Sequence, residues 1–216
     1  VLDVQRGGPA TGLPTKSEQT DLLQVLFGRN GESPMPVIAA TSPTDCFECA
    51  YAASKMALEH MTPVVLMTDA FIANGSAAWR LPNLAEYPAI NPPYVQPEMK
   101  ESWTPYQRNE ETGVRYWAIP GTEGFTHILG GLEKDNKTGA ISTNPENHHL
   151  MTQLRQQKSE KIEVPDVEKM SEAEAKEALV NAGFLLENII VSAKPDPKIP
   201  VEKAIGTENQ SISVEH

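Results

Sequence analysis

Hydrophobic residues in the first third of the chain come in short runs separated by turn-forming residues. Val1–Val4, Met35–Ala40 and Pro63–Asp69 are apolar and rich in β-branched side chains, which predicts three buried strands. Between them, residues 22–26 and 46–60 place apolar side chains at helical spacing. Strands and helices that alternate with short connections predict an α/β fold, with a parallel sheet covered on both faces.

Capping residues suggest where these helices begin and end. Ser17 is a suitable N-cap for the first helix, and Gly28 is a suitable stop. Ser42 and Pro43 predict the start of the second helix, as an N-cap followed by a first-turn proline. Asp69 closes the third strand, where it either lies near a ligand or subunit interface or forms a structural Asx turn.

The residue composition of the sequence changes after Ala73. Residues 80–120 are rich in proline, tryptophan and tyrosine, which predicts a long irregular segment held in place by aromatic packing. Residues 121–142 resemble loops and a hairpin, and Asn144–Lys161 predicts a largely polar helix.

Composition narrows the function classes. The 216 residues are 39% hydrophobic and 22% charged, which is typical of a globular protein. With 18 basic and 29 acidic residues the net charge is −11, which argues against nucleic acid or an anionic membrane as the partner. No apolar run is long enough to span a bilayer, and we expect a cytoplasmic protein.

The cysteines and histidines offer weak candidate sites. Cys46 and Cys49 form a CxxC on an apolar helix face without a second pair, so buried inert thiols are favoured over a redox or metal function. His148 and His149 are adjacent and face different ways on a helix, which favours a polar surface. His127 either lines a cofactor cleft or packs in a turn, and we favour packing. We therefore predict no catalytic and no metal-ligating residue.

The loop after the first strand carries the strongest chemical signal. Arg6 offers a planar fork of donors for a carboxylate or phosphate. Gly7 and Gly8 let backbone N–H groups converge on an anion, and Thr11 and Thr15 add hydroxyl groups. The loop follows the carboxyl end of a strand, where α/β proteins bind ligands. A tight surface turn, with Arg6 paired to a neighbouring carboxylate, is the alternative.

The stretch DVQRGGPATGLPT resembles the corresponding loop of the alpha subunit of 2-oxoacid:ferredoxin oxidoreductases, of the 2-oxoglutarate type. Within the stretch, Ala10 departs from the serine that is usual in that family. The similarity continues in SPTDCFECAYAASKMALEHMTPVVLMTDAFIANGSAAW, in WAIPGTEGFTHILGGLEKDNKTG and in NPENHHLMTQLRQQK. It covers residues 1–161.

The resemblance implies a domain of the thiamine-diphosphate-binding, pyrimidine type. Such enzymes decarboxylate a 2-oxoacid oxidatively, transfer the acyl group to coenzyme A and pass the electrons to ferredoxin. By resemblance, Arg6 binds the C1 carboxylate of the substrate, and Thr15 contacts the 2-oxoacid. Mg²⁺ and the diphosphate are shared with a beta subunit, the iron–sulfur cluster lies in a partner subunit, and we expect none of them to be bound by this chain alone.

The chain also departs from the family pattern. A Tyr-Pro-Ile-Thr-Pro motif and the glutamate that activates the cofactor, both from the segment before the loop, do not occur here. We therefore expect a pyrimidine-type domain that lacks its N-terminal part and is inactive without that segment and a beta subunit. A bare sheet edge predicts poor solubility or a homodimer.

The tail resembles a different family. Residues 162–216 are predicted to form a small α+β module similar to a PASTA domain, with a Val-Pro-Asp-Val opening, Ser171 as N-cap and Glu174 three residues later. This leaves an alternative function open. The chain could be a non-catalytic binding or scaffold protein, with a relic enzyme domain in 1–161 and an interaction module in its tail.

Overall fold

The fold is built on a small parallel sheet. The computed structural model describes residues 1–9, 12–13, 16–162, 191–194 and 211–214. Three strands, β1 (Leu2–Gln5), β2 (Val37–Ala39) and β3 (Val65–Asp69), pair in the order β1-β3-β2, and both pairings are parallel. The predicted α/β fold class is confirmed, and the central strand β3 is buried from Val65 to Thr68.

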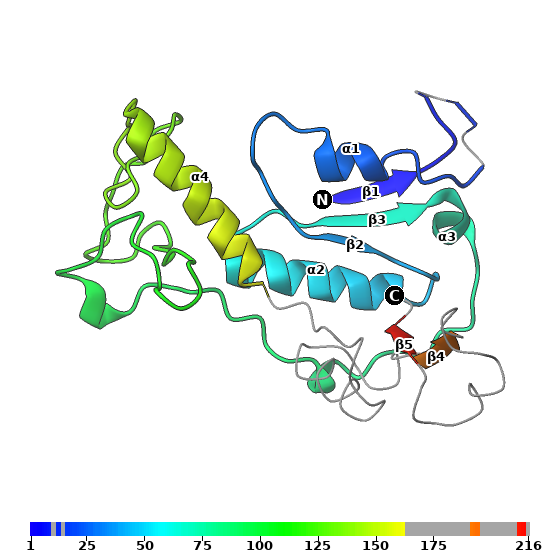
Figure 1. Cartoon of the computed structure of the whole chain (residues 1–216). Helices are drawn as coiled ribbons and strands as arrows, with labels where there is room; N and C mark the ends of the chain where they lie inside the picture. The colour runs from blue at the N-terminus through cyan, green and yellow to red at the C-terminus, as the bar shows by residue number, and fades with distance from the viewer. Residues whose placement is uncertain (10–11, 14–15, 163–190, 195–210, 215–216) are drawn as a thin grey trace.

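Helices lie on both faces of this sheet (Figure 1). The helix α2 (Cys46–His60) packs on one face, where its Cys49 joins a core cluster with Leu66 of β3 and Ile72 of the short helix α3 (Ala70–Asn74). The helix α1 (Leu22–Phe27) belongs to the other face. Near α1, the backbone N–H of Asp21 donates to the side-chain oxygen of Gln5, which is buried. Successive side chains of a strand point to opposite faces of the sheet, so Gln5 and its neighbours in β1 face different sides.

The predicted start of the first helix is wrong. The helix begins at Leu22 with Asp21 as its N-cap residue, and it ends at Gly28 as predicted. Ser17 lies outside it, because its hydroxyl is engaged across the molecule with the backbone N–H of Phe71 at 3.0 Å. A side chain that finds a partner far along the chain is unavailable to the turn beside it.

The second helix also starts later than predicted. Ser42 and Pro43 lie in a turn, in which the backbone N–H of Asp45 donates to the Ser42 carbonyl at 3.2 Å, and the regular helix starts at Cys46. The Asp45 carboxylate turns back to the N–H of Thr41 at 2.9 Å. The predicted end at His60 is confirmed, and Met61 follows in the left-handed conformation.

The proline-rich segment is irregular and makes aromatic ring contacts, as predicted. It contains two single turns of 3-10 helix, η1 (Leu84–Glu86) and η2 (Pro97–Met99). Ring contacts attach it to α2 and to itself: Phe47 meets Trp79 and Tyr87, and Tyr94 meets Trp117 edge-on. Contacts between aromatic rings hold this segment in place, where other segments are held by the hydrogen bonds of helices and strands.

The long helix α4 (Pro145–Glu160) follows the irregular segment. Asn144 is its N-cap, and the Asn144 side chain accepts from the Asn147 N–H at 2.8 Å. Met151 is buried, and Lys158 donates to the Met61 carbonyl at 2.7 Å, which joins α4 to the end of α2.

In the tail, β4 (Val191–Lys194) and β5 (Ser211–Val214) pair antiparallel. The predicted PASTA-like helix lies outside the described residues, and the boundary between 1–161 and 162–216 stays a prediction. In the portions of the chain that the structure describes, no helix has the length and apolar character that crossing a membrane requires.

Candidate functional site

The loop that carries Arg6 leaves β1 at the carboxyl edge of the sheet, beside α3 (Figure 1). Gln5 is the last residue of β1 and pairs with Asp69, the last residue of β3. Arg6 follows directly and is exposed, whereas Gly7 is buried. In parallel sheets this edge is where ligands bind, so the loop lies where the sequence predicts a ligand site.

Backbone hydrogen bonds close the loop on itself. The Gly7 N–H donates to the Lys16 carbonyl at 2.8 Å, and the Leu13 N–H donates to the Gly7 carbonyl at 2.7 Å. Gly12 has φ +43°, and a Cβ there would lie 2.0 Å from the Gly7 oxygen. Only glycine fits this close approach, so the glycines shape the loop from within.

Two side chains hold the base of the loop. The Thr20 hydroxyl donates to the Arg6 carbonyl at 3.0 Å, and the Gln5 side chain accepts from the Asp21 N–H at 3.4 Å. The loop therefore presents Arg6 from a backbone that is bonded on both sides. Sequence reasoning missed Thr20, because a hydroxyl bonded fourteen residues away leaves no local pattern.

Three of the predicted substrate-binding residues, Arg6, Gly7 and Gly8, are described, and they are consecutive in the loop. The N–H of Gly7 is committed to Lys16 within the loop. Thr11 and Thr15 lie outside the described residues. The assignment of all five as substrate contacts stays a prediction.

Of the two CxxC cysteines, Cys49 lies in the core cluster and Cys46 packs against it. Burial, together with the nearby Asp45 carboxylate, raises the pKa of Cys49 to about 12. Burial also raises the pKa of Cys46, whose thiol donates to the Ser42 carbonyl at 3.5 Å. A metal site or reactive nucleophile needs a thiolate, so this pair is suited to packing.

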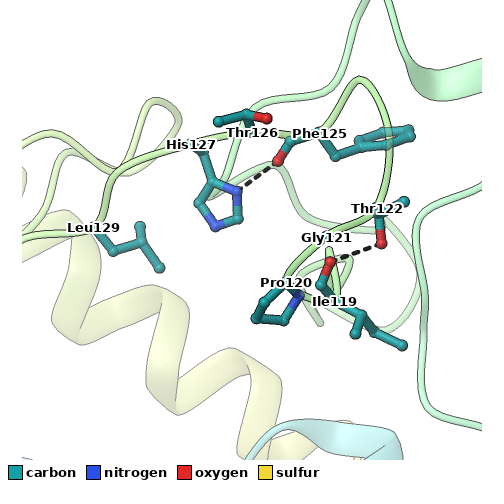
Figure 2. A pocket seen from close by; sticks show the side chains of 8 residues that line it. All are labelled: Ile119, Pro120, Gly121, Thr122, Phe125, Thr126, His127 and Leu129. Atoms are coloured by element: carbon teal, nitrogen blue, oxygen red, sulfur yellow. Dashed lines mark hydrogen bonds between the residues drawn. The ribbon is translucent and has the colours of Figure 1, made fainter.

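A half-open cavity of about 330 Å³ lies on the segment after the aromatic region (Figure 2). His127 lines it, and the Nδ1 atom of His127 lies 2.8 Å from the Phe125 carbonyl oxygen. The imidazole ring of His127 also contacts the Trp103 ring edge-on, with 5.0 Å between the ring centroids. His127 is exposed and follows the turn at residues 123–124, so the predicted place in a turn is wrong. Its ring contacts Trp103 and borders the hollow.

Four cations gather where α4 meets the segment before it. Lys158 is half-buried, and burial together with Arg108, Arg115 and Arg155 lowers the pKa of its ammonium to about 8. Glu133 lies 3.7 Å from Arg155, while Arg108 and Arg115 donate to the backbone carbonyls of Gly113 and Pro105. Arg108 and Arg115 thus support the backbone of the segment.

The family resemblance implies thiamine diphosphate, Mg²⁺ and an iron–sulfur cluster. We therefore asked whether the described side chains could ligate a metal ion or a cluster. Within the described ranges, no three His, Cys, Asp or Glu side chains are grouped so as to hold a metal ion. The two cysteines are three positions apart, and burial raises the pKa of both thiols. The described residues do not fit a metal–diphosphate or cluster site, and we derive no step through those groups.

Comparison with known protein families gives one match over most of the chain. The profile of the pyruvate flavodoxin/ferredoxin oxidoreductase family, described as thiamine-diphosphate-binding, matches residues 1–147.

Individual relatives agree with it. The 2-oxoglutarate oxidoreductase subunit KorA of Mycobacterium tuberculosis is 54% identical over 168 residues, which cover 78% of this chain and 25% of the relative. The 2-oxoglutarate synthase subunit KorA of Methanothermobacter thermautotrophicus is 28% identical over 151 residues, 70% of this chain and 39% of the relative. The chain thus spans about a quarter of the first relative and less than half of the second.

A solved structure has the same fold. It is 2-oxoglutarate:ferredoxin oxidoreductase from Magnetococcus marinus with 2-oxoglutarate, coenzyme A and succinyl-CoA bound. The TM-score is 0.65 at 32% identity, over 74% of this chain and 27% of that one.

Proposed function

This chain belongs to the pyruvate flavodoxin/ferredoxin oxidoreductase family, and from that premise we propose that it is the substrate-loop part of a 2-oxoacid:ferredoxin oxidoreductase alpha subunit. The proposed reaction is oxidative decarboxylation of a 2-oxoacid to an acyl-CoA, with the electrons passed to ferredoxin. Because the relatives are named for 2-oxoglutarate, that dicarboxylate is the first substrate to test.

One observation supports the role of this chain. Arg6 is exposed on a closed loop at the carboxyl edge of the parallel sheet, and its carbonyl is held by Thr20. The Thr20 hydrogen bond fixes the backbone from which the Arg6 side chain extends. A planar guanidinium binds a carboxylate through two parallel hydrogen bonds and so sets the orientation of the carboxylate. Arg6 would hold the C1 carboxylate and thereby orient the keto carbon that reacts.

We propose partner subunits for the groups that the described residues do not fit, namely the metal–diphosphate and the iron–sulfur cluster. We assign Mg²⁺ and the diphosphate of the cofactor to a beta subunit, and the iron–sulfur cluster to a partner subunit. Coenzyme A and ferredoxin would meet the complex rather than this chain alone. A cytoplasmic setting is part of the proposal, because the two free thiols suit a reducing compartment.

The test uses the chain as part of an alpha subunit that also contains the Tyr-Pro-Ile-Thr-Pro segment, together with a beta subunit of the same family. We would measure the reduction of a viologen dye that depends on 2-oxoglutarate and coenzyme A, and titrate 2-oxoglutarate into the complex by calorimetry. The Arg6→Ala variant should weaken 2-oxoglutarate binding roughly 10- to 100-fold, which is the usual value of a hydrogen bond to a charged group. The Arg6→Lys variant should recover a part, because a lysine binds as a point charge.

Lys137→Ala is the matched control, since it removes an exposed cation far from the loop in sequence. It should leave binding and turnover unchanged. Turnover by the complex and none by the chain alone is the expected pattern. If the complex neither binds nor turns over any 2-oxoacid while the chain is folded, the proposal fails. The alternative of a non-catalytic scaffold would then apply.

A further inference from the structure

Both ends of the Arg6 loop meet at Asp69. The first end is Gln5, which pairs with Asp69 along the β1–β3 ladder. The second end is Ser17, whose hydroxyl lies 3.4 Å from the Asp69 carboxylate oxygen Oδ1. The loop from Arg6 to Lys16 is therefore closed at its neck by one residue of the central strand.

Ser17 and Asp69 share the task of capping α3. Asp69 is the N-cap residue, and its Oδ1 accepts from the Ile72 N–H at 2.9 Å. The N–H of Phe71, the residue before Ile72, donates to the Ser17 hydroxyl at 3.0 Å. This N–H is therefore capped by a residue 54 positions away in the sequence. A helix of five residues gains little from its own hydrogen bonds, which makes such caps important for its start.

We propose that Ser17 and Asp69 form a clasp that holds the Arg6 loop at its neck, and that both are positioning residues for substrate binding by Arg6. This inference rests on the proposed function. Ser17 lies two residues after Thr15 in the sequence, and Asp69 is paired with the residue before Arg6. The clasp thus fixes Gln5 and Ser17, the described residues that flank the loop, relative to each other.

A purely structural cap would stabilise α3 without affecting the loop, and the two roles can be separated on the chain by itself. The loop contains the trypsin-sensitive bonds after Arg6 and Lys16. Ser17→Ala should speed tryptic cleavage at these bonds at least about threefold, because one lost hydrogen bond changes an opening equilibrium by that order. Ser17→Thr, which keeps the hydroxyl, should restore the wild-type rate.

Asn144→Ala is the matched control, because it removes a comparable cap from α4 and does not touch the loop. It should leave cleavage at the loop unchanged. Loop cleavage in Ser17→Ala that is no faster than in wild type would overturn the clasp, whatever the activity of the variant.

The positioning role is tested in the complex with the beta subunit. Ser17→Ala and Asp69→Asn should raise KM for 2-oxoglutarate roughly threefold to tenfold with a smaller change in kcat, since they alter the placement of Arg6 and not the reacting groups. Arg6→Ala separates the two claims. If it keeps wild-type turnover, the proposed function fails. If it loses turnover while Ser17→Ala keeps the wild-type KM, the positioning role fails.

Discussion

Gly12 and Lys158 are residues whose surroundings leave them little freedom. Gly12 combines a positive φ with a backbone oxygen where a side chain would begin. Lys158 places an ammonium among three guanidinium groups and holds a carbonyl of the left-handed residue Met61. In both cases the chemistry of one position affects a segment far from it in sequence.

Gly12→Ala should open the Arg6 loop. The added Cβ would lie 2.0 Å from the Gly7 oxygen, and the φ of +43° is itself unfavourable for alanine. We expect a loss of more than about 1 kcal/mol in the free energy of unfolding, together with faster tryptic cleavage after Lys16. Gly31→Ala is the control, because Gly31 has φ +68° with nothing within 4 Å of a Cβ. Equal effects of the two substitutions on both readouts would contradict the steric explanation.

Lys158 should make stability depend on pH in a defined direction. Its pKa is lowered from 10.5 to about 8, chiefly by burial, so the folded chain binds fewer protons than the unfolded chain between these values. The contribution of Lys158 to stability is complete above pH 10.5 and is lost as the pH falls through about 8.

Urea unfolding of wild type and Lys158→Met at pH 7 and pH 9.5 measures this contribution. Wild type should gain stability relative to the variant at the higher pH. A difference that is the same at both values would show that Lys158 titrates normally.

At the scale of elements, the helices depend on residues outside themselves. The first helix has no buried residue, α3 borrows a cap from Ser17, and α4 is anchored through Asn144 and Asn147. Asn147 also binds the hairpin before the helix, donating to the Lys134 carbonyl and accepting from the Asn136 N–H. Local helix propensity therefore explains less of this fold than the contacts at the helix ends do.

Asn144→Ala should cost about 1 kcal/mol in the free energy of unfolding, since alanine cannot accept the Asn147 N–H. Asn144→Asp should be close to wild type, because aspartate caps as well and its charge suits a helix N-terminus. Urea denaturation of the three proteins gives the comparison. A loss as large in Asn144→Asp would point to the amide donors of Asn144 and away from the cap.

At the scale of the whole molecule, large apolar side chains remain uncovered. Leu23 and Phe27, one turn apart on α1, are 70% and 78% exposed, and β1 forms one edge of the sheet. Exposed apolar area of this kind favours association. The predicted homodimer stays a prediction that this surface supports.

We expect the chain alone to self-associate, and Leu23→Lys with Phe27→Lys to weaken that association at least roughly tenfold. Burial of one such side chain contributes about 1.5–3 kcal/mol, which the lysines would remove. Sedimentation velocity over a concentration series measures it. Leu81→Lys is the control, because Leu81 is 79% exposed in a different segment. A chain that stays monomeric at all concentrations would contradict this expectation.

The sequence by itself determined the alternation of the three strands with α1 and α2, the end of α2 at His60, the presence of α4 and the family. These depend on short-range signals: runs of apolar residues, capping residues and a long collinear motif. The resemblance to 2-oxoacid:ferredoxin oxidoreductases, stated from the loop and three further segments, is confirmed by the match over residues 1–147.

Only the tertiary structure decided what each capping side chain binds. Ser17 looked like the cap of the helix that follows it, and it caps α3 instead, because the parallel pairing of β1 with β3 brings residues 17 and 71 together. Thr20 and Lys158 likewise bind carbonyls far along the chain. A hydroxyl or an ammonium binds whichever group the fold brings within reach, and that choice is made across the sheet, where no local pattern of residues records it.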